Sequence, residues 1–162
     1  LHKEYRRQRQ MCIRDSIKAM LGGNVKAMNL YMNDIALATF SSFDVGKHFS
    51  QRSQPERFYH GFVLGLLVEV RDLYEIRSNR ESGYGRYDVM LIPKTKKNDG
   101  IILEFKVKEA EEKTLEETVQ TALAQIEDKE YDTELLELGV SKEHIRHYGF
   151  AFEGKKVLIG QK

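Results

Sequence analysis

Two acidic residues lie inside segments that otherwise have the pattern of buried β-strands. Asp88 lies in the segment Arg86–Ile92 and Glu104 in the segment Ile101–Val107, and the turn Lys94–Gly100 with its Asn-Asp-Gly signal connects them. The two segments therefore predict an antiparallel hairpin. Removing an ion from water costs several kcal/mol unless the ion is paired or binds a counterion. The hairpin thus requires a partner or a bound cation for each carboxylate.

Helical and strand patterns alternate along the rest of the chain. Apolar residues recur at helical spacing over three segments, which are Asn24–Thr39, Pro55–Asp72 and Thr114–Tyr131. Strands, including the hairpin, are expected at Leu73–Ser78, Arg86–Ile92, Ile101–Val107, Ile145–Phe152 and Lys156–Ile159. Thr114 and Glu117 fit a capping box. The order of elements predicts an α/β (α+β) fold in which helices flank a mixed β-sheet.

The length of 162 residues allows one domain with a sizeable core and makes a second full domain improbable. The first sixteen residues lack periodicity and an initiator methionine, and they resemble translated adaptor sequence. A nucleic-acid-binding arm is the alternative, because Arg6-Arg7-Gln8-Arg9 is basic. We expect residues 1–16 to be a non-native or disordered segment. Residues 17–162 are expected to form one domain, with a helical prefix at 17–54 and a core at 55–162, at the C-terminus of a longer protein.

Charge and cysteine content narrow the class of protein. The net charge is +1, and residues 107–137 carry three lysines against eleven acidic residues. The globally basic surface of a nonspecific duplex-binding protein is therefore missing. The longest apolar run, Phe62–Val70, contains Glu69 and is shorter than the roughly 20 residues of a membrane span. The single Cys12 fits a reducing compartment, so we expect a cytoplasmic protein without a membrane partner.

Strand alternation predicts a cluster of ionisable side chains in the hairpin. It places Asp88 and Tyr87 on opposite faces, and it places Glu104 and Lys106 on one face. Two carboxylates and an ammonium group are therefore expected to converge at one end of the sheet. Magnesium requires only one or two carboxylates from a protein. Asp88, Glu104 and the carbonyl of Phe105 are thus predicted to hold Mg²⁺ or Mn²⁺, while Lys106 orients a water or stabilises charge on a phosphate.

Four further candidates have an ordinary explanation beside a functional one. Glu56, in the first turn of its helix, is either a metal or water ligand or a partner of the helix dipole. His60 is either an accessory of the site or a satisfied core histidine, and the structural role is slightly favoured. Gln125 orients a water or phosphate, or is a polar residue at the boundary of the core. Arg86, which follows a loop with two glycines, contacts phosphates or is merely solvated.

The arrangement Glu56…Asp88…Glu104-Phe105-Lys106…Gln125 resembles the PD-(D/E)XK nuclease superfamily, whose restriction-endonuclease-like core has the order αβββαβ. The resemblance covers roughly residues 17–162. More narrowly, the segments 55–62, 85–88 and 104–106 look like the domain found C-terminal to AAA-type ATPase-like modules in anaerobic bacteria. Tyr87 stands where the superfamily name has proline, a variation that does not affect the ligands.

The resemblance implies a Mg²⁺- or Mn²⁺-dependent nuclease that hydrolyses phosphodiester bonds of DNA. The implied catalytic residues are Asp88, Glu104, Lys106, Glu56 and Gln125. Nucleic acid and an upstream AAA-type ATPase module are the implied partners. The alternative is a catalytically silent nuclease-fold domain that serves as an interaction module, and the acidic stretch Glu109–Glu137 suits a protein partner. The simplest explanation is a structural ion pair of Lys106 with Asp88 or Glu104.

Overall fold

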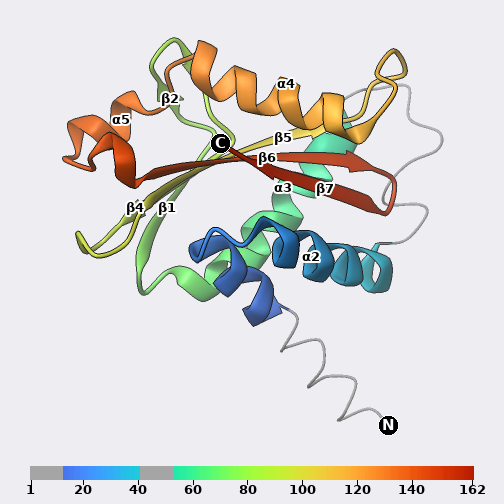
Figure 1. Ribbon diagram of the computed structural model, residues 1–162, viewed down its shortest axis with the longest axis horizontal. Coiled ribbons are helices and arrows are strands. Elements are labelled where there is room, and N and C mark those ends of the chain that lie inside the picture. The colour runs from blue at the N-terminus through green and yellow to red at the C-terminus, as the bar shows by residue number, and fades with distance from the viewer. Residues whose placement is uncertain (1–12, 41–52) are drawn as a thin grey trace, which may run out of the picture.

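The computed structural model describes residues 13–40 and 53–162, in which a mixed sheet lies between two helical layers (Figure 1). The sheet has the order β1-β4-β5-β6-β7, with β1 Tyr74–Ser78, β4 Val89–Pro93, β5 Gly100–Val107, β6 Ile145–Glu153 and β7 Lys156–Gln161. The helices are α2 Val25–Thr39, α3 Ser53–Leu67, α4 Leu115–Asp128 and α5 Thr133–Glu137, with 3₁₀ turns at Val68–Val70 and Lys142–His144. Residues 13–21 are also helical. This architecture confirms the predicted α/β (α+β) fold.

Strand β5 is the centre of the sheet and extends beyond its neighbour β4. The antiparallel pairing of β4 with β5 ends at Val89 and Leu103. The parallel pairing of β5 with β6 continues as far as Val107 and Phe152. Residues 104–107 of β5 therefore have β6 on one edge and no β4 ladder on the other. This open edge of β5 is called the notch below.

Helix α4 covers one face of the sheet, as Figure 1 shows. The Thr114 hydroxyl accepts a hydrogen bond from the Glu117 amide at 3.3 Å, as the capping box predicts. The Glu117 carboxylate bonds the amide of Lys113 at 2.7 Å, one residue before the cap. The helix lies close to the sheet because Gly149 and Gly160 face each other beneath it, and a Cβ on either glycine would lie within 3 Å of Val119.

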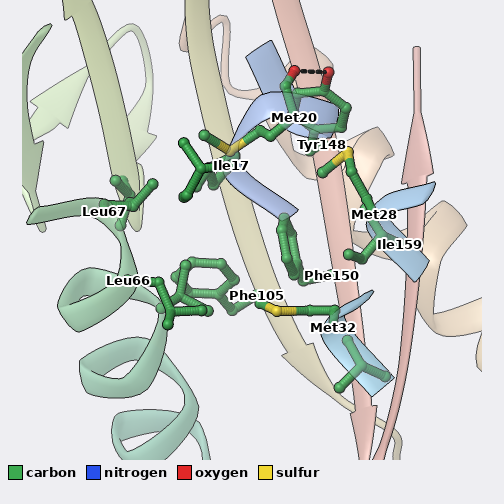
Figure 2. Close-up of a cluster of buried hydrophobic side chains, with 14 of the residues drawn as sticks. Ile17, Met20, Met28, Met32, Leu66, Leu67, Phe105, Tyr148, Phe150 and Ile159 are labelled. Atoms are coloured by element: carbon green, nitrogen blue, oxygen red, sulfur yellow. Dashed lines mark hydrogen bonds between the residues drawn. The ribbon is translucent and has the colours of Figure 1, made fainter. Parts of the chain in front are cut away.

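The other face of the sheet is covered by α2, α3 and residues 13–21. Figure 2 shows their apolar side chains against those of the strands; the labelled residues are Ile17, Met20, Met28, Met32, Leu66, Leu67, Phe105, Tyr148, Phe150 and Ile159. The Tyr148 hydroxyl donates to the carbonyl of Met20 at 2.7 Å. Ser16 is buried as well. The helix thus begins before the predicted boundary at residue 17, whereas residues 1–12 lie outside the described residues.

Two asparagines of α2 bond to the edge strand β7. The Asn29 amide donates to the carbonyl of Ile159 and accepts from its N–H, both at 2.8 Å. The Asn33 amide donates to the carbonyl of Val157 at 2.7 Å and accepts from its N–H at 3.0 Å. These backbone groups are the ones through which a further strand would pair with β7. Helix α2 is therefore fixed to the sheet by hydrogen bonds as well as by apolar contacts.

The structure differs from expectation just before β4. The predicted loop at residues 79–85 contains a small hairpin, formed by β2 Glu81–Ser82 and β3 Gly85–Arg86. Arg86 belongs to β3, and β4 begins only at Val89. Tyr87 packs in the apolar cluster on the α4 side, together with Met90. Tyr87 was expected on the face of Val89 and Leu91, but it lies with Met90 on the opposite face, because strand alternation does not extend to a residue outside the strand.

Two helical expectations also require adjustment. The helix α3 ends at Leu67, before the predicted end at Asp72, and continues as the 3₁₀ turn Val68–Val70. Leu37 has helical spacing with the buried residues of α2 but is 63% exposed, because it lies off the face that packs on the sheet. Gly139 ends α5 with φ of 84°, as expected for a glycine at that position. No helix among the described residues is long and apolar enough to cross a membrane.

We predict that Asn33→Ala lowers the free energy of unfolding by about 1–3 kcal/mol, because Val157 loses a partner for both its N–H and its C=O. Urea denaturation measures this difference. Asp34→Ala is the matched control, since Asp34 is exposed on the same helix and its loss should change stability by no more than about 0.5 kcal/mol. Equal effects of the two substitutions would contradict a stabilising role for the α2–β7 bonds.

Candidate functional site

Asp88 and Glu104 lie opposite each other where the β4–β5 ladder ends. Val89 pairs with Leu103, so the preceding Asp88 faces the following Glu104 across the hairpin. The Asp88 carboxylate accepts a hydrogen bond from the Phe105 amide at 2.8 Å, where a backbone carbonyl of β4 would bond if the ladder continued. The N–H and C=O of one residue in a strand point to the same edge. The carbonyl of Phe105 therefore also faces the notch beside Asp88.

Glu104 is the most unusual group of the site because its side chain is only 2% exposed. One carboxylate oxygen, Oε1, accepts a hydrogen bond from the Gln125 amide and lies 3.5 Å from the Lys106 ammonium. The other oxygen, Oε2, is buried and has no hydrogen-bond partner among the described residues. A buried acceptor without a partner is costly, and more so if it carries charge. The position of Oε2 therefore suits a bound cation.

Burial raises the pKa values of three carboxylic acids at the site, and the charge of Asp88 adds to the shift of the other two. Burial and, to a lesser degree, the charge of Asp88 raise the pKa of Glu104 to about 8, while Lys106 opposes the shift. Burial likewise raises the pKa of Asp88, although the hydrogen bond from Phe105 favours its charged form. The pKa of Glu56 is raised by burial and then by Asp88. A divalent cation would relieve this repulsion and favour the charged form of all three groups.

Glu56 approaches the notch from the other side of the sheet. It lies in the first turn of α3, and with Lys106 it lines a cleft of about 370 Å³. The remaining lining residues are Val107, Lys108, Glu109, Ala110 and Glu111. Because β4 does not extend alongside residues 104–107, the end of β5 is accessible from the α3 side. The notch thus brings a third carboxylate within electrostatic reach of Asp88 and Lys106.

A short chain of hydrogen bonds connects α4 to the segment before Asp88. The Gln125 amide donates both to Glu104 and, at 3.1 Å, to the Tyr131 hydroxyl. That hydroxyl donates to the carbonyl of Arg86 at 2.6 Å. Tyr131 was not a sequence-based candidate, since it follows α4 as one more aromatic residue of the apolar core. The sequence carries no signal of this contact, because a spacing of six residues does not place two side chains on one face of a helix.

Neither accessory candidate has a side-chain hydrogen bond to Asp88 or Glu104 within the described part of the chain, although the charge of His60 lies near enough to Asp88 to lower its pKa. His60 shares a hydrogen bond of 2.8 Å with the Ser78 hydroxyl, and its ring packs edge-on against Phe105 at 5.5 Å between centroids. These contacts suit a histidine that is satisfied within the structure. The Arg86 side chain is exposed, and only its backbone carbonyl takes part in the chain of hydrogen bonds.

The donor set at the notch fits a hard divalent cation held by few protein ligands. Within residues 13–40 and 53–162, no three His, Cys, Asp or Glu side chains form a group that could hold a metal ion. Magnesium keeps several waters and binds through one or two carboxylates. Asp88, Glu104 and the Phe105 carbonyl match this requirement. Glu56 therefore fits contact with a metal-bound water better than direct ligation.

In metal-free protein, we predict that the free energy of unfolding falls as the pH rises from about 4.5 toward about 8. Over this range the unfolded chain loses the Glu104 proton while the folded protein, whose pKa is about 8, retains it. Rising pH therefore favours the unfolded state. Urea denaturation at several pH values checks this, and Glu104→Gln should remove this part of the slope. The prediction would be contradicted if the free energy of unfolding had the same pH dependence in the wild type and in Glu104→Gln. It would also be contradicted if the exposed control Glu111→Gln changed that pH dependence as much as Glu104→Gln does.

The comparison with protein families agrees with this geometry. A family model described as the PD-(D/E)XK nuclease superfamily matches residues 54–162, which is more than half of the chain. The match includes α3 from its second residue, all the strands and α4, and thus every residue of the candidate site, whereas α2 lies before it. Comparisons with curated proteins and with solved structures gave no match. The chain belongs to the PD-(D/E)XK nuclease superfamily.

Proposed function

We propose that this domain is a nuclease that hydrolyses phosphodiester bonds of DNA with Mg²⁺ or Mn²⁺. The observation that carries the proposal is the buried, unpartnered oxygen of Glu104 beside Asp88 and Lys106 at an open notch. An ion pair of Lys106 with Glu104 accounts for one oxygen of Glu104 but not for the Asp88 carboxylate at the same open edge. Membership of the superfamily supports the reaction class.

Asp88, Glu104 and the Phe105 carbonyl would hold the metal ion. The chemistry that the ion supplies when bound is polarisation of the phosphate and a lowered pKa of a bound water. Asp88 is oriented for this role by the bond from the Phe105 amide. Gln125 donates to Oε1 of Glu104, so Oε2 would be the oxygen available to the cation.

Lys106 and Glu56 act on the water and phosphate in the cleft that they line. The Lys106 side chain is 27% exposed, so its ammonium group can contact both Glu104 and a ligand in the cleft. There it positions the attacking water or stabilises the charge that develops on the phosphate. Glu56, which also lines the cleft, would accept a hydrogen bond from a metal-bound water or from the nucleophile.

We predict that the purified protein nicks supercoiled plasmid DNA when Mg²⁺ or Mn²⁺ is present and not in EDTA. Lys106→Ala should lower the cleavage rate by about 10²–10³-fold, since it removes one preorganised charge from the transition state. Asp88→Ala should abolish cleavage, since it removes a metal ligand. Agarose gel electrophoresis measures the rates.

The control variant is Lys97→Ala, an exposed lysine in the turn between β4 and β5, which should cut at the wild-type rate. Circular dichroism establishes that each variant is folded. Wild-type rates in both Lys106→Ala and Asp88→Ala would refute the mechanism. A loss of cleavage in these variants would show that the cleavage is not due to a contaminating nuclease, because a contaminant does not depend on these residues.

A second candidate is an interaction module without catalysis. The exposed carboxylates of Glu109 and Glu111 line the cleft, and a phosphate backbone would be repelled there. A basic protein surface would complement them. In the intact bacterial protein, which we propose to be cytoplasmic, an upstream AAA-type ATPase module is the partner that the family resemblance supports.

Calorimetric titration with Mn²⁺ separates the two candidates. We predict that wild-type protein binds Mn²⁺ with heat release that follows a binding isotherm, and that Asp88→Asn and Glu104→Gln bind at least tenfold more weakly. Glu56→Gln should bind with a smaller loss, because its contact is through water. Absence of binding in the wild type would favour the interaction module over the nuclease.

A further inference from the structure

The small hairpin β2–β3 presents an aromatic side chain to solvent. Tyr84, in its two-residue turn, is 76% exposed, more than any other large hydrophobic residue among those described. Turns of this kind are ordinarily occupied by small or polar residues. A tyrosine there adds nothing to the core, and its ring is available for contact with a ligand.

The hairpin is held firmly against the end of α4, beside which it lies in Figure 1. The Tyr84 amide donates to the carbonyl of Lys129 at 2.7 Å. Gly83 has φ of 58°, and a Cβ there would lie 2.2 Å from the Lys129 carbonyl oxygen, so the turn requires glycine. The Ser82 hydroxyl donates to the carbonyl of Tyr131 at 2.8 Å. An isolated two-stranded hairpin is marginally stable, whereas this one presents Tyr84 in a fixed position.

The same contacts connect the hairpin to the candidate site. Tyr131 bonds both Gln125, which holds Glu104, and the backbone of Arg86 at the end of the hairpin. Tyr84 precedes Asp88 by four residues, which span at most ~14 Å. The two side chains extend this reach further, so a short segment of one strand can contact the Tyr84 ring and the candidate site together.

The charge around the hairpin suits a single phosphate strand. Arg80 and Arg86 are exposed on either side of Tyr84, and neither has an ion pair within the described part of the chain. Glu81 is the cross-strand partner of Arg86 and reduces the positive charge. Two arginines with one glutamate do not make the broad basic surface on which a duplex is bound. They match one strand whose bases stack on an aromatic ring.

We propose that Tyr84 is a stacking platform for an unpaired base, so that the domain recognises single-stranded DNA or unpaired segments of DNA. The inference rests on the proposed function for its partner, which is nucleic acid. In a duplex both faces of an internal base are covered by its neighbours, and only an unpaired base offers a face to the tyrosine ring. The base on Tyr84 fixes the position of the strand relative to the phosphate at Asp88 and Glu104.

Fluorescence anisotropy in EDTA tests this without cleavage. The probes are a labelled single-stranded DNA oligonucleotide of mixed sequence and its blunt duplex, at one salt concentration. We expect Tyr84→Ala to weaken single-strand binding ~5- to ~150-fold, the range that corresponds to loss of one base–aromatic stack. Tyr84→Phe, which retains the ring, should bind as the wild type does. Binding of the duplex should be the same in all three proteins.

The control is Leu37→Ala, which removes another exposed apolar side chain, from α2 on the opposite face of the sheet, and should change neither affinity. Thermal melting establishes that the variants are folded. The proposal is overturned if Tyr84→Ala binds single strands as the wild type does, or if it loses equal affinity for both probes. Tyr84-dependent binding by a wild type that cuts nothing with Mg²⁺ or Mn²⁺ would support the platform and refute the nuclease. Cleavage by a wild type whose single-strand binding does not depend on Tyr84 would support the nuclease and refute the platform.

Discussion

A carboxylate in the central strand is the constraint around which this fold is arranged. β5 is covered by helices on both faces, and its residues from Gly100 to Phe105 are buried. Glu104 interrupts this apolar run, and its ionised form is unfavourable there unless a counter-charge approaches. Three features lie where they lessen that cost: the early end of β4, the ammonium of Lys106 and the amide of Gln125.

The early end of β4 has a second effect. Residues 104–107 lack a strand on one edge, so the Phe105 N–H donates to the Asp88 carboxylate instead of to the backbone of a neighbouring strand. The same gap admits α3, whose first turn brings Glu56 to the cleft. A β4 longer by two residues would close the notch and separate the two faces of the sheet. The site therefore depends on where one strand ends as much as on which residues it contains.

Much of this could be predicted from the sequence, and the exceptions have a common cause. The hairpin around Lys94–Gly100 and the helix after Thr114 follow from alternation, turn chemistry and capping, which are local properties. The meeting of Asp88 with Glu104 follows from the register that the hairpin imposes. Strands of two residues have no detectable period, so the β2–β3 hairpin was missed.

The remaining omissions depend on contacts between distant parts of the chain. Tyr131 reaches Arg86 across 45 positions, and Asn33 reaches Val157 across 124. No local pattern distinguishes such a residue from an ordinary surface or core residue. A polar residue such as asparagine in an amphipathic helix is predicted to face solvent, although here its amide bonds to the backbone of β7.

Helix α2 imitates a sixth strand in geometry as well as in bonding. Its residue numbers rise as those of β7 fall, from Asn29 with Ile159 to Asn33 with Val157, which is the antiparallel sense. Four helical residues advance 6 Å and two strand residues about 6.8 Å, so successive amides nearly keep step with successive outward-facing groups of β7. The mismatch grows with each successive pair of hydrogen bonds, so a helix can pair in this way only with a short edge strand. Strand β7 has six residues and is short enough to be paired in this way along its edge.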